Sequence, residues 1–257
     1  MHVVHVNQDP GIAPGRAKGA AVHLDAMRSA FAVAGCRVSA IDEADPAEAR
    51  ERLETLHGAE PVGLVYERYA LEAFAAGAFA RRHGVAHVLE GNAPLLEAAR
   101  AHRGRPVAPG EGARAAGLFA GATAVLAVSR AVAAYVRARG VPVMRVLVRP
   151  NGVDARRFHP LDVGERASRR RLLGVGADDL VLGFHGRLRP WHGFERLSRL
   201  VRTALDAGLP ARLLIVGEGP FEQHIDGLPR ERVTRLGWLP HEEVAGVVGC
   251  FDALPLG

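Results

Sequence analysis

Short apolar runs alternate with helical patterns along almost the whole chain of 257 residues. The runs are continuous rather than alternating with polar residues, which is typical of strands buried on both faces of a parallel sheet. The predicted strands cover residues 3–6, 36–41, 62–66, 85–90, 124–128, 144–149, 180–186, 211–216, 232–236 and 250–254. This pattern predicts an α/β fold with helix-covered parallel sheets.

Helical spacing of apolar residues separates these strands. The predicted helices cover residues 20–34, 46–57, 70–83, 130–139 and 194–207. The pattern restarts after the turn-rich PNGVD at residues 150–154, so we expect two doubly wound, Rossmann-like domains, at 1–149 and 150–257. No helix follows the last predicted strand, so the second domain is expected to be incomplete.

The charge and composition narrow the classes of function. The net charge is +5, but Lys18 is the single lysine, and the arginines that make up the other basic residues are dispersed. No nucleic-acid partner is therefore expected, whereas an anionic substrate or membrane surface stays open. No apolar run is long enough to span a membrane, and no secretory signal begins the chain, which predicts a cytoplasmic protein.

The stretch GFHGRLRPWHGFERL, residues 183–197, joins a predicted strand to a predicted helix. Gly186 permits a tight exit from the strand, and Arg187 and Arg189 can project from the turn. Gly193 leaves the amides at the start of the helix accessible, and a helix N-terminus favours an anion. Guanidinium groups bind phosphate through forked hydrogen bonds, so this joint predicts a phosphate or diphosphate site. The alternative is a solvated arginine turn in which His192 caps the helix.

Two further joints have a similar shape. LLIVGEGP, residues 213–220, places Glu218 between two glycines, and an acidic residue after a strand often contacts a ribose hydroxyl; the alternative is a plain surface turn. In PGRAKGAAVHL, residues 14–24, Gly19 opens a helix directly after Lys18. Neither the dinucleotide fingerprint nor the P-loop pattern is present, which disfavours a dehydrogenase and a P-loop NTPase.

Polar residues follow two strands of the first half: Glu67 and Arg68 follow one, and Glu90 and Asn92 the next. Glu90 could act on a sugar hydroxyl or carry a proton, and Asn92 could bind a hydroxyl, because polar residues at strand ends are often functional. Alternatively, Glu67 pairs with Arg68, and Asn92 only shapes the turn. No Cys/His cluster has zinc spacing, and no G-x-S-x-G segment is present.

Together these segments resemble the retaining glycosyltransferases of family 4, which have the GT-B fold. The segments that carry the resemblance, in the order of the family, are NQDPGIAPGRAKGAAVHL, YERYALEAFAAG, VLEGNAPLLE, VLAVSRAV, VRPNGVDARRFHP, GFHGRLRPWHGFERL, LLIVGEGP and VTRLGWLPHEEV. The resemblance implies an acceptor-side first domain and a nucleotide-sugar (donor) second domain. It implies transfer of a hexosyl group, with retention, from a UDP- or GDP-sugar to a hydroxyl of a glycan, lipid-linked or small-molecule acceptor. No cofactor or metal is expected, and peripheral contact with the inner face of a membrane is implied.

The resemblance also assigns residues to roles. The residues expected at the donor diphosphate are Gly19, Arg187, Arg189 and His192. Those expected at the nucleotide are Gly217, Glu218, Gly219 and Leu239. The acceptor-side residues are Lys18, His23, Glu67 and Arg68, and the expected catalytic residues are Glu90 and Asn92. His192 stands where the family usually has lysine, and it is a weaker, pH-dependent phosphate ligand.

The sequence departs from the family at its end. The paired-glutamate motif E-x7-E is expected after residues 250–254, but the sequence stops at Gly257. A truncated donor domain is therefore expected, with little turnover by this chain alone and pairing with a complementary C-terminal chain. The alternatives are a non-catalytic module that binds a nucleotide-sugar or glycan, and a gene fragment. A dinucleotide-dependent epimerase would need Tyr-x-x-x-Lys, which Pro14 before Lys18 excludes.

Overall fold

A computed structural model describes residues 1–12, 19–71, 73–102, 106, 108–189, 192–219, 225 and 227–254. Lys18 of the predicted acceptor side lies outside the described residues. The internal contacts divide the chain into two compact units, Met1–Gly152 and Val153–Gly257, which we call the N-terminal and C-terminal units.

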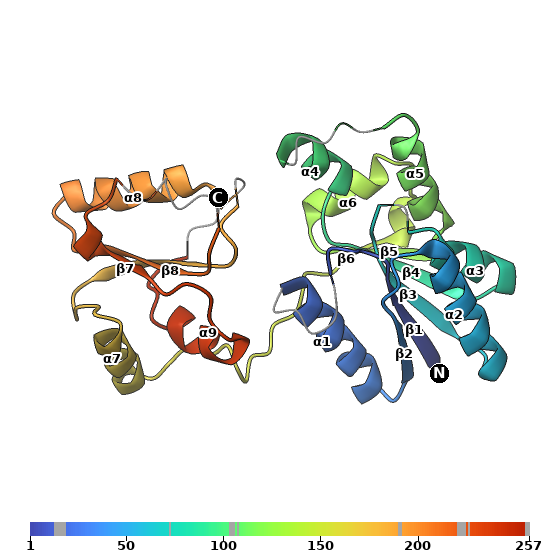
Figure 1. The fold of residues 1–257 in the computed structure, drawn as a ribbon, viewed down its shortest axis with the longest axis horizontal. Coiled ribbons are helices and arrows are strands. Elements are labelled where there is room, and N and C mark those ends of the chain that lie inside the picture. The colour runs from blue at the N-terminus through green and yellow to red at the C-terminus, as the bar shows by residue number, and fades with distance from the viewer. Residues whose placement is uncertain are drawn as a thin grey trace. The chain divides into compact units, whose positions relative to one another are not determined.

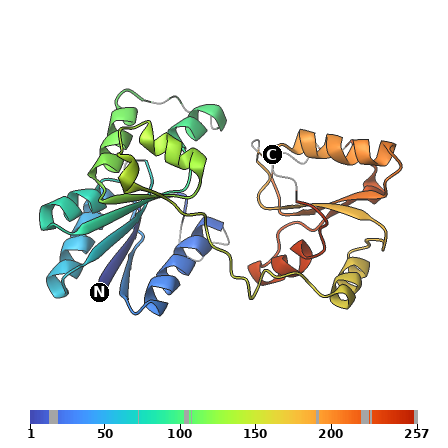
Figure 2. The ribbon, with the colours of Figure 1, turned by 180° about the vertical axis from the view of Figure 1, so that it is seen from behind.

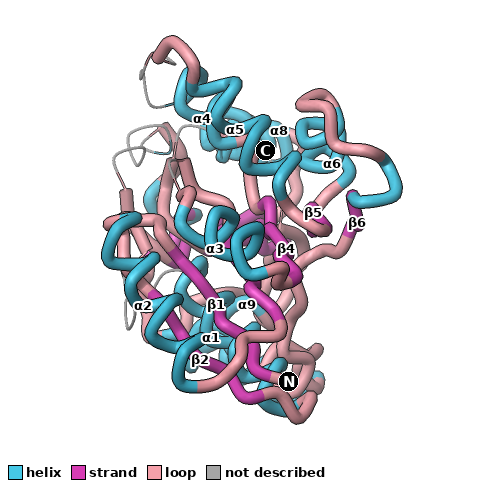
Figure 3. Tube along the Cα trace, turned by 90° about the vertical axis from the view of Figure 1, so that its right-hand side faces the viewer, coloured by secondary structure: helices cyan, strands magenta, loops and turns pink. Residues whose placement is uncertain are grey.

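The N-terminal unit contains a six-stranded sheet in which every pairing is parallel, in the order β2-β1-β3-β4-β5-β6. Figure 3 shows strands of this sheet in magenta. Its strands are β1 (His2–Asn7), β2 (Arg37–Ile41), β3 (Leu64–Arg68), β4 (Ala86–Gly91), β5 (Ala124–Ala127) and β6 (Val146–Val148). Its helices are α1 (Gly19–Val33), α2 (Pro46–Ala59), α3 (Ala75–His83), α4 (Leu95–His102), α5 (Glu111–Gly121) and α6 (Arg130–Arg137). The strand order reverses between β1 and β3, and ligands of open parallel sheets bind beyond the strand ends at such a point.

Helices cover the two faces of this sheet differently. α2 and α3 lie on one side and α1 on the other (Figure 1). Val4 and Val6 of β1 pack with Leu53 of α2 and Phe79 of α3 in one apolar cluster. The intervening residue His5 points to the α1 side, because successive side chains of a strand alternate between faces. The two faces therefore differ in polarity.

Local signals set several helix starts. Asp45 accepts hydrogen bonds from the amides of Ala47 and Glu48 at the start of α2, where Pro46 is the first helical residue. Ser129 accepts a hydrogen bond from the Val132 amide at 3.2 Å and so caps α6. Such caps satisfy amides that have no partner inside the helix.

The C-terminal unit contains a three-stranded parallel sheet in the order β7-β8-β9. Its strands are β7 (Leu180–His185), β8 (Ala211–Val216) and β9 (Val233–Arg235), and its helices are α7 (Val163–Leu172), α8 (Phe194–Asp206) and α9 (His241–Val248). α8 covers one face of the sheet, and α7 and α9 lie on the other (Figure 2). The buried side chains Phe194, Leu197 and Val201 attach α8 to its face.

The predicted α/β class with two parallel sheets is confirmed, but several predicted elements were wrong. The predicted strand at 250–254 is only an isolated bridge, in which Ala253 pairs with Leu182 of β7. The predicted helix at 70–83 begins only at Ala75, and α4, α5, α7 and α9 were not predicted.

Candidate functional site

The turn from β7 to α8 carries the side chain of Arg187. Arg187 is exposed, and its guanidinium has no hydrogen-bond or ion-pair partner in the part of the chain that the structure describes. Gly193 precedes α8 with a φ of 63°, and no side chain caps the helix at that residue. A left-handed conformation suits glycine, so this residue can turn the chain into the helix and leave its first turn open. The described part of the turn predicted to bind phosphate thus carries a guanidinium without a described partner and leads into α8.

His192 and Arg189 hold the shape of this turn. The amide of Arg189 donates to His192 Nδ1 at 3.2 Å, and the amide of His192 donates to the Arg189 carbonyl at 3.0 Å. Burial lowers the pKa of His192, so the ring is neutral at pH 7. The predicted diphosphate ligand His192 is therefore tied to the backbone of the turn and carries no charge to offer, and it does not cap α8.

Glycines bring the loops after β7 and β8 into backbone contact. The amides of Gly186 and Leu188 donate to the carbonyls of Val216 and Glu218, so the pairing of β7 with β8 continues past the strand ends. A Cβ at Gly217 would overlap the carbonyl oxygen of Gly186, and one at Gly219 would overlap that of Leu188. Only glycine fits such an approach, and Gly217 also has a φ of 117°. The G-E-G segment is thus required by loop packing.

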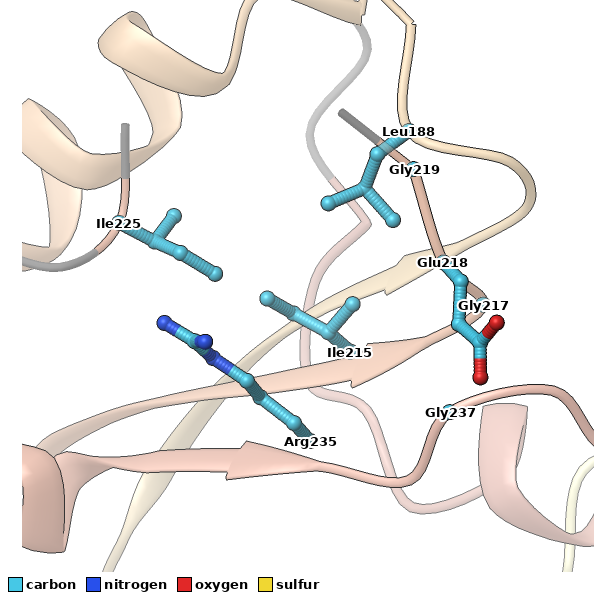
Figure 4. Close-up of a pocket in the computed structure, with 8 residues that line it drawn as sticks. All are labelled: Leu188, Ile215, Gly217, Glu218, Gly219, Ile225, Arg235 and Gly237. Atoms are coloured by element: carbon cyan, nitrogen blue, oxygen red, sulfur yellow. The ribbon is translucent and has the colours of Figure 1, made fainter. Parts of the chain in front are cut away.

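A cavity of about 420 Å³ opens beside these loops. Figure 4 shows the aliphatic side chains of Leu188, Ile215 and Ile225 around it, with the guanidinium of Arg235 near Ile225. Glu218 lies at the opposite edge, where its carboxylate approaches Gly237. This volume falls within the range of small-molecule sites.

The remaining predicted nucleotide residue, Leu239, lies partly buried against the apolar cluster that contains Val216 and Val244. Its side chain is therefore a packing group, and only its main chain is left to contact a base. Glu218 is the exposed acidic group among the predicted nucleotide residues, and its carboxylate has no hydrogen-bond partner among the residues described.

In the N-terminal unit, the carboxylate of Glu90 is held by two side chains. Tyr66 Oη donates to Glu90 Oε2 at 2.9 Å, and His23 Nε2 lies 2.6 Å from Glu90 Oε1. Burial acts to raise the pKa of Glu90, but the hydrogen bonds of His23 and Tyr66, with a smaller contribution from Asn92, lower it on balance. An ionised carboxylate only accepts, so His23 Nε2 carries the proton. The carboxylate of Glu90, predicted as catalytic, is thus engaged by His23 and Tyr66.

A second polar layer lies behind this pair. His5 of β1 is fully buried and packs edge-on against the Tyr66 ring, and Arg28 of α1 donates to its Nδ1 at 3.2 Å. Burial and the Arg28 charge lower the pKa of His5 to about 4. Arg28 also pairs with Asp42 at 2.7 Å. Sequence reasoning missed His5, Arg28 and Tyr66, although polar residues in alternate positions of HVVHVN signalled a polar face of the sheet.

Glu67 is not at the rim where we expected it. It is fully buried, and its Oε2 lies 2.8 Å from Nε2 of His87, which is also buried. Glu67 and Arg68 point to opposite faces of β3, so neither the predicted contact of Glu67 with an acceptor nor the alternative, a pair with Arg68, fits the position of Glu67. Burial raises the pKa of Glu67, and the hydrogen bond with His87, which lowers it, offsets only part of that rise.

Buried polar atoms without partners gather near the reversal of strand order. Both amide atoms of Gln8, directly after β1, and Nη1 of Arg68, at the end of β3, are buried and unbonded among the described residues. Such atoms cost free energy unless a partner arrives. Gly19 begins α1 nearby in sequence, and a Cβ there would meet no atom within 4 Å.

Among the described residues, no group of three or more His, Cys, Asp or Glu side chains is arranged to hold a metal ion. Within the same residues, no helix is both long and apolar enough to cross a membrane.

Curated proteins similar in sequence are glycosyltransferases. A D-inositol 3-phosphate glycosyltransferase of Actinosynnema mirum is 43% identical over 77 residues, which is 29% of this chain and 18% of that protein. A GDP-mannose-dependent monoacylated alpha-(1-6)-phosphatidylinositol monomannoside mannosyltransferase of Corynebacterium glutamicum is 29% identical over 106 residues, or 40% of this chain and 28% of that protein. The chain therefore matches less than a third of the length of these relatives. No family model matches the chain.

Solved structures similar in fold span nearly the whole chain. Anabaena HepE in complex with UDP has a TM-score of 0.69 at 18% identity, covering 98% of this chain and 72% of that one. A sucrose-phosphate synthase from Thermosynechococcus elongatus has a TM-score of 0.69 at 17% identity, covering 98% of this chain and 74% of that one. At such identities the likeness shows the fold.

Proposed function

We propose that this chain, which is homologous to glycosyltransferases and has the GT-B fold, belongs to an enzyme that transfers a hexosyl group from a nucleoside-diphosphate sugar. The observation that carries the proposal is the exposed guanidinium of Arg187, without a partner among the described residues, in the turn that leads to α8, where Gly193 provides no side-chain cap. Both features attract the oxygens of a diphosphate. The fold neighbour with bound UDP and the GDP-mannose-dependent relative support a nucleotide-sugar donor.

In the proposed reaction, the bond between the anomeric carbon and the diphosphate oxygen breaks, and a hydroxyl oxygen of the acceptor bonds to that carbon with retention of configuration. The hydroxyl proton passes to the departing diphosphate. Negative charge grows on the departing nucleoside diphosphate. Arg187, Arg189 and the first amides of α8 neutralise that charge, without a bound metal, which is the electrostatic part of catalysis. The cavity beside Gly217 and Glu218 would receive the nucleoside, with Glu218 accepting from ribose hydroxyls.

For the acceptor, we propose His23 as the contacting group. Its Nε2 lies against Glu90, so Nδ1 is the ring nitrogen left for a ligand, and no partner for it lies among the described residues. Nδ1 can therefore form a hydrogen bond with an acceptor hydroxyl, while Gln8 and Arg68 offer further polar atoms. A glycan, a lipid-linked sugar or a small polyol fits this chemistry, and a lipid-linked acceptor would be met at the inner face of a membrane.

Calorimetric titration of the chain with UDP, GDP, ADP and their sugars, in EDTA, tests the donor site. We expect saturable binding of at least one diphosphate, weakened by about tenfold or more in Arg187→Ala, because hydrogen bonds to charged groups contribute about 1.5–3 kcal/mol. Arg199→Ala is the matched control, since Arg199 is an exposed arginine of α8 with no described partner. Equal affinities of the two variants, or no binding of any nucleotide at millimolar concentration, would refute the proposed donor site.

A further inference from the structure

A second cavity lies in the N-terminal unit, between α3 and α5. Its volume is about 540 Å³, and it shares no residue with the strand-end sites described above. α3 and α5 contact each other, and α3 packs against β3 and β4 on the side of the sheet opposite α1. The cavity is therefore separated by the sheet from the His23–Glu90 pair.

Small residues on both helices create this space. Gly77 on α3 and Gly117 and Gly121 on α5 line it together with two alanines. A Cβ at Gly117 would meet no atom within 4 Å, so that wall is open rather than closed by a neighbour. A Cβ at Gly121 would come within 2.8 Å of Arg81 Nη1, and one at Gly77 within 3.5 Å of the same atom. The guanidinium of Arg81 thus extends from α3 across to α5, in room that the glycines provide.

Two cations line a largely apolar space. Besides Arg81, Arg114 of α5 lines the cavity, and Phe74 and Leu118 supply its larger apolar walls. Neither guanidinium has a hydrogen-bond or ion-pair partner among the described residues, whereas the neighbouring Arg82 lies 3.5 Å from a carboxylate oxygen of Glu54. Two unpaired guanidiniums over an apolar floor are complementary to a molecule with an anionic head and an apolar body.

We propose that the α3–α5 cavity is a binding site for an amphiphilic anion, a carboxylate or phosphate on an apolar body, with the anion on Arg81 and Arg114. The apolar body lies over Gly117 and Leu118. The volume suits a small ligand of this kind. The proposal does not depend on the proposed glycosyl transfer, because it uses other residues on the other face of the sheet.

Titration with the fluorescent probe dansyl-undecanoate measures this site in the full chain. We expect saturable binding, weakened about tenfold or more in the double variant Arg81→Ala/Arg114→Ala, because the loss of each guanidinium removes a charge-assisted hydrogen bond to the anion. Its control is Arg130→Ala/Arg137→Ala, which removes the same charge from two exposed, unpaired arginines of α6. Equal weakening in the two double variants would overturn the proposal.

A second pair of variants tests the cavity without changing charge. Gly117→Leu fills the open wall and should abolish binding, while Gly112→Leu on the same helix, where an added Cβ also meets nothing within 4 Å, should leave it unchanged. Both substitutions favour the helix, so circular dichroism should report folded proteins. Unimpaired binding by Gly117→Leu would exclude this cavity.

Displacement of the probe identifies the source of the anion. Competition by octyl phosphate but not by phosphatidylglycerol vesicles indicates a free amphiphile, and competition by the vesicles indicates a membrane lipid. Displacement by neither, or equal displacement by the uncharged octyl glucoside, contradicts an anionic amphiphile as the ligand.

Discussion

The strand ends of the two units are built in different ways. In the N-terminal unit, side chains form hydrogen bonds with one another: Tyr66 and His23 bond to Glu90, and Arg28 bonds to His5. In the C-terminal unit, backbone meets backbone through Gly217 and Gly219, and the exposed side chains of Arg187 and Glu218 have no partner among the described residues.

The two kinds of contact position different groups. A buried side-chain network fixes the position of the half-buried His23 ring, and the strength of this network depends on pH through the groups that titrate. A glycine-packed backbone edge fixes the position of loops and leaves charged side chains ready for a ligand. Substitutions in the two regions should therefore produce effects of different size and kind.

The largest effect on stability is expected at the close backbone contact of Gly217 with Gly186. Gly217→Ala places a methyl group into the Gly186 carbonyl at a positive φ, and should lower the free energy of unfolding of the C-terminal unit by about 4 kcal/mol or more. Both tryptophans, at residues 191 and 238, belong to this unit, so tryptophan fluorescence in urea reports on it alone.

The matched substitution is Gly58→Ala in α2, where an added Cβ meets no atom within 4 Å. It should stabilise the N-terminal unit by about 0.5–1 kcal/mol, because alanine restricts the unfolded chain. A wild-type urea transition in Gly217→Ala would show that the loops are not held by close backbone contact.

An intermediate effect on stability is expected when the pH is lowered through the range in which His5 titrates. Because His5 has a folded pKa of about 4, below its ordinary 6.5, the unfolded chain takes up a proton that the folded chain does not, and stability falls as the pH drops through this range. The loss should total about 3 kcal/mol by pH 4. Urea denaturation of His5→Gln, which keeps an acceptor near Arg28, should show a shallower pH dependence by about 1.4 kcal/mol per pH unit. Parallel pH curves for the two proteins would exclude a buried neutral His5.

The smallest effect is expected from one hydrogen bond of the network. Tyr66→Phe leaves Glu90 Oε2 without its donor and should destabilise the N-terminal unit by about 2 kcal/mol, because that oxygen is buried and charged. Tyr69→Phe is the control, because the Tyr69 hydroxyl lies 3.4 Å from the Tyr135 hydroxyl, which is a long hydrogen bond. This variant should lose only about 0.5 kcal/mol in the free energy of unfolding. Similar losses in both variants, measured by chemical denaturation, would mean that Tyr66 does not hold a charged Glu90.

The sequence predicted the features that depend on near neighbours. The alternation of apolar runs with helical patterns indicated two parallel sheets, and Ser129 marked the start of α6. The positions of Gly217, Gly219 and Arg187 in loops after strands were predicted from the local pattern, and their roles at a nucleotide and a diphosphate stay predictions.

Tertiary structure alone decided which partner each polar side chain takes. Glu67 and Arg68 are adjacent in sequence but point to opposite faces of β3, and Glu67 meets His87 because β3 and β4 pair in one register. His23 reaches Glu90 only because α1 packs on that face of the sheet. The segment at 250–254 has strand composition, yet one bridge to β7 is all the pairing it makes. Composition encodes a preference for burial or extension, whereas pairing requires a neighbour that folding brings from far along the chain.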